Sequence, residues 1–141
     1  MELLTKLNSW AAIRRWFDMA VERLEAQGFR VGCPIGSLAN ELADRDEVAR
    51  RDLVECFAAW EGYLVDGLER MRARGDLVAT ADPEELATAV FASMQGGLLL
   101  AKTRKKSRPL RIALDAALAY LRSFAPDRSR SKQTRGSPGA R

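Results

Sequence analysis

Apolar residues recur along most of this chain at intervals of three and four, the spacing of one face of an α-helix. No segment alternates apolar and polar residues over the length of a strand. The clearest stripe falls within residues 47–74 and ends before Gly75; it consists of Leu53, Phe57, Trp60, Leu64, Leu68 and Met71. A second amphipathic segment covers residues 10–27, with Ser9 as its cap and Gly28 after its end. The pattern predicts an all-α protein, an antiparallel bundle of about five to six helices.

Three further helices complete this prediction. A short helix is expected over residues 37–43. The sequence "DPEEL" then marks a sharp helix start, with Asp82 as N-cap and Pro83 in the first turn, and predicts a helix over residues 83–102. Pro109 begins the last expected helix, which runs to Phe124.

Residues 86–101 are uncharged, so the helix over residues 83–102 has no polar face through its middle. This stretch rises about 24 Å, short of the roughly 30 Å of a membrane core. Burial on both sides is the better explanation, and a homodimer with a four-helix bundle would provide it. The alternative is that the rest of one subunit covers these faces. The residues expected at the dimer interface are small or apolar: Ala89, Ser93, Gly97, Ala101, Leu110, Leu114, Ala117 and Leu121.

Large side chains on the other helices could surround a mostly apolar ligand cavity, or could fill a solid core. Gln95 lies in an apolar stretch and needs hydrogen-bond partners if it is buried, so it is the candidate polar anchor of such a cavity. The candidate ligand-binding residues are Trp16, Phe17, Ala20, Phe57, Trp60, Tyr63, Phe91, Met94 and Gln95.

The amino-acid composition restricts the kinds of catalytic and metal sites that the chain can form. The 141 residues contain no histidine, which excludes Ser-His-Asp and Cys-His catalysis and histidine-bound zinc. Five of the 23 basic residues and one of the 19 acidic residues follow Ala125, which leaves 18 of each sign before it. The net charge of +4 therefore belongs to a Ser-, Gly-, Pro- and Arg-rich tail, residues 125–141, expected to be disordered. The absence of a secretory signal and of paired cysteines favours a cytoplasmic protein with free thiols.

Two local clusters could carry chemistry. In "VGCPIGSLANEL", residues 31–42, no lysine follows the second glycine and no strand precedes the first, so the segment is a connector rather than a phosphate loop. Cys33 in this connector is a possible redox thiol. Asp44, Asp46 and Glu47 could bind a cation, but interleaved arginines favour a salt-bridged helix start. No catalytic residues, cofactor or metal are expected, and the chain is not expected to be an enzyme.

Five segments in this order give the chain a family resemblance: "GCPIGSLANEL" (residues 32–42), "WxxxL" (60–64), "GDL" (75–77), "DPEELA" (82–87) and "MQGGLLLAK" (94–102). Together they resemble the C-terminal domain of TetR-family transcriptional regulators, in the LmrA/YxaF-like branch. The resemblance implies that residues 10–124 form a ligand-binding and dimerisation domain. It also implies that the last two helices form the dimer bundle and that a small hydrophobic or aromatic effector lies between the earlier helices and the first dimer helix.

In that family, effector binding changes the spacing of two N-terminal helix-turn-helix domains and releases DNA. Here residues 1–9 resemble the truncated end of a linking helix, so the DNA-binding domain is expected to be absent and no membrane contact is expected. The alternative is a stand-alone helical dimer that binds a small molecule or senses redox state through a thiol, with no DNA role.

Overall fold

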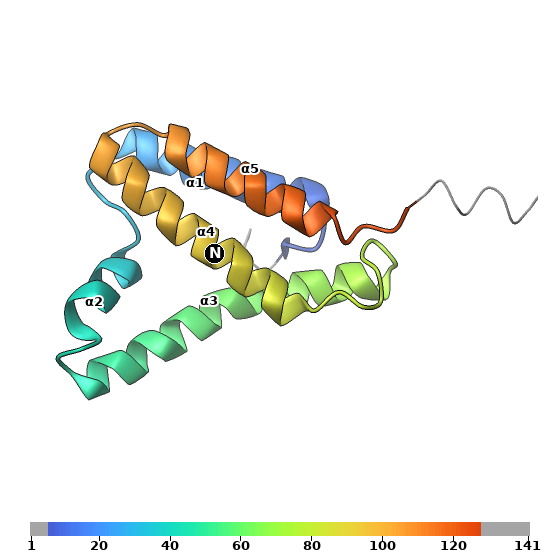
Figure 1. Ribbon diagram of the computed structural model, residues 1–141, viewed down its shortest axis with the longest axis horizontal. Helices are drawn as coiled ribbons and strands as arrows, with labels where there is room; N and C mark the ends of the chain where they lie inside the picture. The colour runs from blue at the N-terminus through green and yellow to red at the C-terminus, as the bar shows by residue number, and fades with distance from the viewer. Residues whose placement is uncertain (1–5, 128–141) are drawn as a thin grey trace, which may run out of the picture.

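The computed structural model describes residues 6–127, and most of this part of the chain is helical (Figure 1). The described residues contain no strand, which confirms the all-α prediction. The five α-helices are α1 (Trp10–Ala26), α2 (Pro34–Leu42), α3 (Glu47–Ala73), α4 (Pro83–Arg104) and α5 (Arg108–Arg122).

Polar side chains fix the start of three helices, as the sequence predicts. The Ser9 hydroxyl accepts a hydrogen bond from the Ala12 amide at 3.2 Å. The carboxylates of Asp46 and Asp82 each accept two amide hydrogen bonds at the starts of α3 and α4. These bonds satisfy backbone donors that have no partner inside the helix. Beyond α1, Gly28 adopts a left-handed conformation with φ 59°, as expected of a residue that follows a helix end.

The short second helix begins earlier than the sequence analysis expects. α2 starts at Pro34 rather than at residue 37, with proline in the first turn, where its missing N–H costs nothing. The thiol of Cys33 caps this helix by accepting a hydrogen bond from the Gly36 amide, with a donor–acceptor distance of 3.4 Å. The connector is thus shorter than expected, and Gly36 lies inside the helix.

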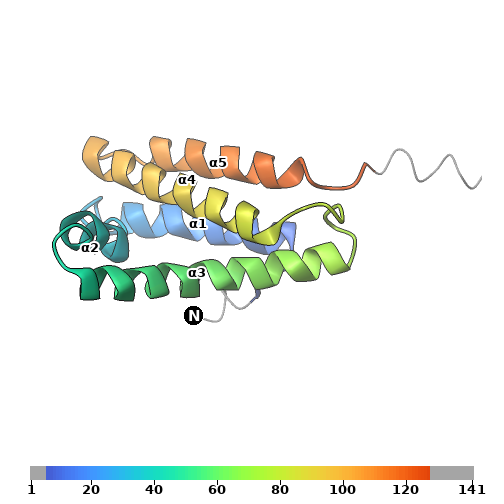
Figure 2. The ribbon, with the colours of Figure 1, turned by 60° about the horizontal axis from the view of Figure 1, so that its bottom comes forward.

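The four long helices, α1, α3, α4 and α5, pack around a common core. α4 and α5 run antiparallel beside each other, and α4 also packs on α3, while α1 packs under α5 (Figure 2). This core includes one residue from each of these helices, Ile13, Leu68, Val90 and Leu114, all almost fully buried. Among residues 6–127, no helix is both long enough and apolar enough to cross a membrane.

The segment that precedes α1 packs closely on α3. Leu7 is 1% exposed, and its carbonyl oxygen lies so close to Gly67 that a Cβ at this glycine would be 2.0 Å from it. The Arg74 guanidinium donates a hydrogen bond to the carbonyl of Asn8. Lys6 has 3₁₀-helical geometry, and Leu7, Asn8 and Ser9 are not helical. The expectations for residues 1–5 and 128–141 lie outside the described residues.

Candidate functional site

Four of the nine predicted ligand-binding residues come together in the core. Trp16, Phe17, Phe91 and Met94 are all at most 8% exposed. The ring centroids of Trp16 and Phe17 are 5.3 Å apart, and those of Trp16 and Phe91 are 5.7 Å apart, both in tilted arrangements. Such aromatic packing favours a rigid apolar base for the surface above it.

The remaining five predicted residues are less buried. Ala20, Phe57, Tyr63 and Gln95 are half-buried, and Trp60 is 42% exposed. Phe57 and Trp60 belong to the apolar stripe of α3, whose other members, including Leu53 and Leu64, are buried. The aromatic middle of α3 is thus less buried than the aliphatic members of the same stripe. The neighbouring helix α2, which contacts α3, buries none of its own residues.

Gln95 of α4 lies against α2. A Cβ added at Gly36 would be 2.5 Å from the Gln95 Oε1 atom and 3.5 Å from the Cβ of Cys33. A larger residue at this position would therefore displace the end of the Gln95 side chain. The glutamine amide and the Cys33 thiol both lie next to Gly36, at the same end of α2. Both cysteines are free thiols, and Cys56 is exposed on α3.

Exposed large apolar side chains form two further groups. The α2–α3 apolar surface consists of Val31, Leu38, Val48, Val54 and Trp60, each at least 42% exposed. The α4–α5 outer face carries Leu99, Leu100, Ile112 and Tyr120, each at least 38% exposed, together with the exposed small residues Ala92, Gly96, Ala116 and Ala119. On α4 and on α5 these residues recur at helical spacing and share one face, and an exposed apolar face of this kind is typical of binding regions.

The residues assigned to a dimer contact from the sequence lie mostly inside one chain. Gly97, Ala101, Leu110, Leu114, Ala117 and Leu121 are buried, and Ala89 and Ser93 are half-buried. A Cβ at Gly97 would be 3.0 Å from both Ala113 Cβ and Leu110 Cδ1 of the same chain. The small residues thus bring α4 close to α5 within the subunit. This corrects the assignment of the buried six, because a side chain covered by its own subunit has no surface left for another.

The exposed residues of the α4–α5 outer face are not among those predicted for the dimer interface, although the sequence pattern contains them. Residues 92, 96, 99 and 103 repeat at helical spacing opposite the buried row of α4. In an uncharged helix both faces appear equally apolar, so the pattern alone did not distinguish the inner face from the outer one.

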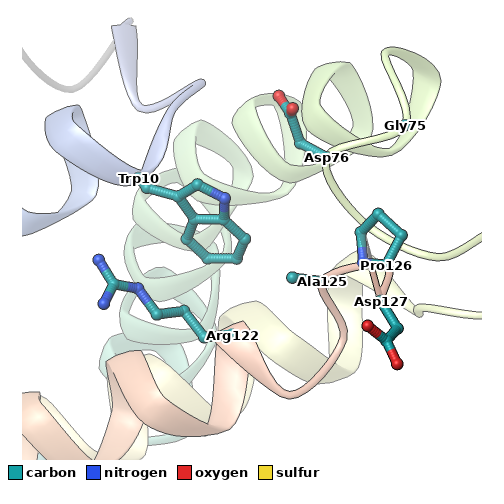
Figure 3. A pocket seen from close by; sticks show the side chains of 7 residues that line it. All are labelled: Trp10, Gly75, Asp76, Arg122, Ala125, Pro126 and Asp127. Atoms are coloured by element: carbon teal, nitrogen blue, oxygen red, sulfur yellow. The ribbon is translucent and has the colours of Figure 1, made fainter. Parts of the chain in front are cut away.

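A hollow lies elsewhere, at the end of the molecule where α1 begins and α5 ends (Figure 3). Its volume is about 450 Å³ and it contains none of the nine predicted ligand-binding residues. The Arg122 guanidinium lies 6.0 Å from the centroid of the Trp10 ring, within the range of a cation–π interaction. The lining residues are Trp10, Gly75, Asp76, Arg122, Ala125, Pro126 and Asp127.

The acidic cluster at the α2–α3 turn is a salt-bridged helix start, as expected. Glu47 accepts hydrogen bonds from Arg50 at 2.6 and 2.7 Å and from Arg51 at 3.2 Å. These bonds lower the pKa of Glu47 to about 2. The bonds from Arg50 have the larger effect and the bond from Arg51 the smaller one. Within the described part of the chain, no group of three or more cysteine or acidic side chains is placed to hold a metal ion.

The fold defines the class of protein. The crystal structure of regulatory protein TetR from Rhodobacter sphaeroides resembles this chain with a TM-score of 0.72 and 28% identity, over 77% of this chain and 58% of that one. Residues 9–116 match the family described as "Transcriptional regulator LmrA/YxaF-like, C-terminal domain". The chain belongs to this family of TetR-type regulators, and both the resemblance and the fold class expected from the sequence are confirmed.

Curated relatives are transcriptional regulators as well. The transcriptional regulator AcuR of Cereibacter sphaeroides is 31% identical over 100 residues, which cover 71% of this chain and 46% of the relative. The HTH-type transcriptional repressor DhaR of Mycobacterium sp. (strain GP1) is 30% identical over 102 residues, which cover 70% and 48%. The chain thus spans about half the length of the curated relatives it matches.

Proposed function

We propose that residues 10–124 form the effector-binding and homodimerisation domain of a TetR-like repressor, and that the effector is a small hydrophobic or aromatic molecule. The matched region carries the description of a C-terminal regulatory domain, and the relatives are regulators rather than enzymes. DNA is bound, in this proposal, through a helix-turn-helix domain that lies outside residues 9–116.

The partly exposed aromatic middle of α3 carries the effector proposal. Phe57, Trp60 and Tyr63 of α3 are only partly buried, Trp16 of α1 and Phe91 of α4 form a buried aromatic pair, and Gln95 supplies an amide on α4. Apolar walls with few polar groups are typical of small-molecule sites. A molecule inserted between α2 and α3 would cover apolar surface that α2 leaves open, and this burial would drive binding.

A thermal-shift screen with aromatic and amphipathic compounds tests the site. We expect at least one compound class to raise the melting temperature, and Trp60→Ala or Gln95→Ala to reduce the rise by half or more. Met19→Ala is the matched control, because Met19 has similar exposure (40%) but lies on α1. A compound that stabilises the wild type and both site variants equally would place the binding site elsewhere.

The α4–α5 outer face is the proposed dimer surface. It presents apolar side chains flanking small residues, a combination that lets helices of two copies approach closely. Sedimentation velocity should give twice the chain mass of 15.7 kDa at micromolar concentration. Gly96→Arg should give a folded monomer, whereas Ala11→Arg, also at an exposed position, should leave the dimer intact. A dimeric Gly96→Arg variant would contradict this surface.

A further inference from the structure

The hollow beside Trp10 brings together segments that lie far apart in the chain. Its walls come from the first residue of α1, from the two residues that follow the α3 C-cap, and from the last residue of α5 with residues 125–127 (Figure 3). Its volume of about 450 Å³ is within the range of small-molecule sites. None of its lining residues belongs to the proposed effector site or to the α4–α5 outer face, so the hollow is a separate feature of the molecule.

Backbone hydrogen bonds hold the walls of the hollow. The Val78 amide donates to the Phe124 carbonyl at 2.8 Å, which joins the α3–α4 connection to the end of α5. Gly75 is left-handed with φ 79°, and the Asp76 amide donates to the Met71 carbonyl at 2.9 Å, which closes the end of α3. Because these bonds already order the walls, little further ordering would accompany the binding of a ligand.

Arg122 provides a positive charge with available donors at one side of the hollow. Its side chain is exposed and forms no ion pair with any other residue of the range 6–127. The guanidinium lies over the Trp10 ring, 6.0 Å from the ring centroid, where the face of the indole attracts a cation. This contact positions the guanidinium through its plane, and its N–H donors remain able to bind an acceptor.

The other charged groups at this end of the molecule are placed differently. Asp76 accepts two hydrogen bonds from the Arg74 guanidinium, at 2.8 and 3.3 Å, so each compensates the charge of the other. Arg72 donates to a backbone carbonyl at 3.0 Å and does not line the hollow. Asp127 is exposed, and Figure 3 shows it at the opposite side of the hollow from Arg122. An anionic group would therefore be attracted to the Arg122 side.

We propose that this hollow binds a small planar aromatic carboxylate, with the carboxylate on the Arg122 guanidinium and the aromatic ring beside the Trp10 indole. A guanidinium presents parallel N–H donors that match the two oxygens of a carboxylate. The indole, the Ala125 methyl group and the Pro126 ring supply apolar surface for the body of the ligand. An uncharged molecule of the same shape would leave the guanidinium without an acceptor, so the site selects an anion.

The contact between Arg122 and Trp10 also has a purely structural interpretation, since it links the end of α5 to the start of α1. In that case the loss of Arg122 would lower the stability of the protein, and no aromatic carboxylate would bind at the hollow. The test must therefore measure ligand affinity separately from stability.

Isothermal titration calorimetry with 2-naphthoate provides this test, and its uncharged analogue 2-naphthamide is the matched probe. We expect one 2-naphthoate site per chain and at least about tenfold weaker binding of the amide, because charge-assisted hydrogen bonds to the guanidinium are lost. Arg122→Gln should weaken 2-naphthoate binding at least about tenfold for the same reason. Arg122→Lys should weaken it about threefold, since the charge stays but the planar pair of donors does not. Trp10→Leu should also weaken binding, by about three- to tenfold.

Arg23→Gln is the matched control, because Arg23 is exposed in the last turn of α1 as Arg122 is in the last turn of α5. It should leave the affinity for 2-naphthoate unchanged, and so should Trp60→Ala. Melting temperatures without ligand identify any variant that fails to fold, and Arg122→Lys then replaces Arg122→Gln in the comparison.

Four results would overturn the proposal. They are the absence of 2-naphthoate binding up to millimolar concentration, equal binding of the amide, affinity that is unchanged in folded Arg122 variants, and loss of binding in Asp127→Asn, which would indicate a cationic ligand. If Trp60→Ala removes binding and the Arg122 variants do not, the compound occupies the proposed effector site. That result would support the proposed function while the proposal for the hollow fails.

Discussion

At the scale of single residues, two glycines of α3 have opposite surroundings. Gly67 is buried beneath the carbonyl of Leu7, whereas a Cβ at Gly62 would meet nothing within 4 Å. Both lie inside the same helix, where glycine is intrinsically unfavourable. The difference in the free energy of unfolding between alanine at position 67 and alanine at position 62 therefore measures how strongly the segment before α1 packs on α3.

We expect Gly67→Ala to lower the free energy of unfolding by about 2–3 kcal/mol, because the backbone of Leu7 would have to move away from α3. Gly62→Ala should be neutral or stabilising by up to about 1 kcal/mol. Urea denaturation followed by circular dichroism measures both. Equal stability of the two variants would show that the segment before α1 does not pack closely on Gly67.

Glu47 gives a prediction about pH. Its pKa in the folded protein, about 2, lies below the ordinary value of 4.5, so its ion pairs with Arg50 and Arg51 are fully formed above pH 4.5. The stabilisation is lost as the pH falls from 4.5 towards 2. Glu47→Gln should therefore lower the melting temperature at pH 7, and the difference from the wild type should shrink towards zero near pH 2.

Glu55→Gln is the control for this series, since Glu55 is exposed on the same helix and forms no ion pair with any other described residue. Melting temperatures by differential scanning fluorimetry between pH 2 and 7 suffice. A difference between wild type and Glu47→Gln that stays constant with pH would contradict the lowered pKa.

At the scale of elements, α2 is the least anchored helix. It buries none of its residues, and its contact with α4 passes through Gly36 and the side chain of Gln95. Its N-terminus is capped by the Cys33 thiol rather than by an oxygen, and sulfur is a weak acceptor. Elements with little buried surface open locally at low cost, which suits a helix that covers a proposed effector site.

Gly36→Ala tests this contact. The added Cβ would displace the flexible end of Gln95, so the free energy of unfolding should change by less than about 1 kcal/mol. Effector affinity should fall about three- to tenfold, because the amide would leave its place beside α2. Ser37→Ala, at the next position and exposed, should change neither quantity. Isothermal calorimetry with a compound from the screen decides; unchanged affinity would remove Gln95 from the site.

The elements also show what a sequence can predict. Helix starts at Ser9, Asp46 and Asp82 are local, since the cap and the amides that it binds lie within three residues, and they were legible. The inner and outer faces of α4 were not distinguishable, because the row through Gly97 fits α5 of the same chain as well as another subunit. The exposure of Trp60 depends on which elements pack on the middle of α3, which is a tertiary property.

At the scale of the whole molecule, positive charge has two separate sources. The residues before Pro126 contain equal numbers of bases and acids, yet six of the bases lie together in residues 102–111. Residues 128–141 add five further bases and no acid. The net charge of +4 therefore understates the local density of positive charge at each place.

Duplex DNA should consequently bind to this chain weakly, independently of sequence and less with rising salt. Each phosphate contact contributes about 0.9 to the slope of log K against log salt concentration, so removing the five bases by ending the chain at residue 127 should flatten the slope by several units. Arg104→Glu/Arg108→Glu should reduce the slope by about two at most, and less if the proposed dimer already covers these side chains.

Glu55→Lys, a charge change outside both regions, is the control. Fluorescence anisotropy between 25 and 200 mM salt, with two unrelated duplexes, measures these slopes. Tight binding to one duplex and not to the other would show a sequence-reading surface in this chain, which its two clusters of point charges do not provide.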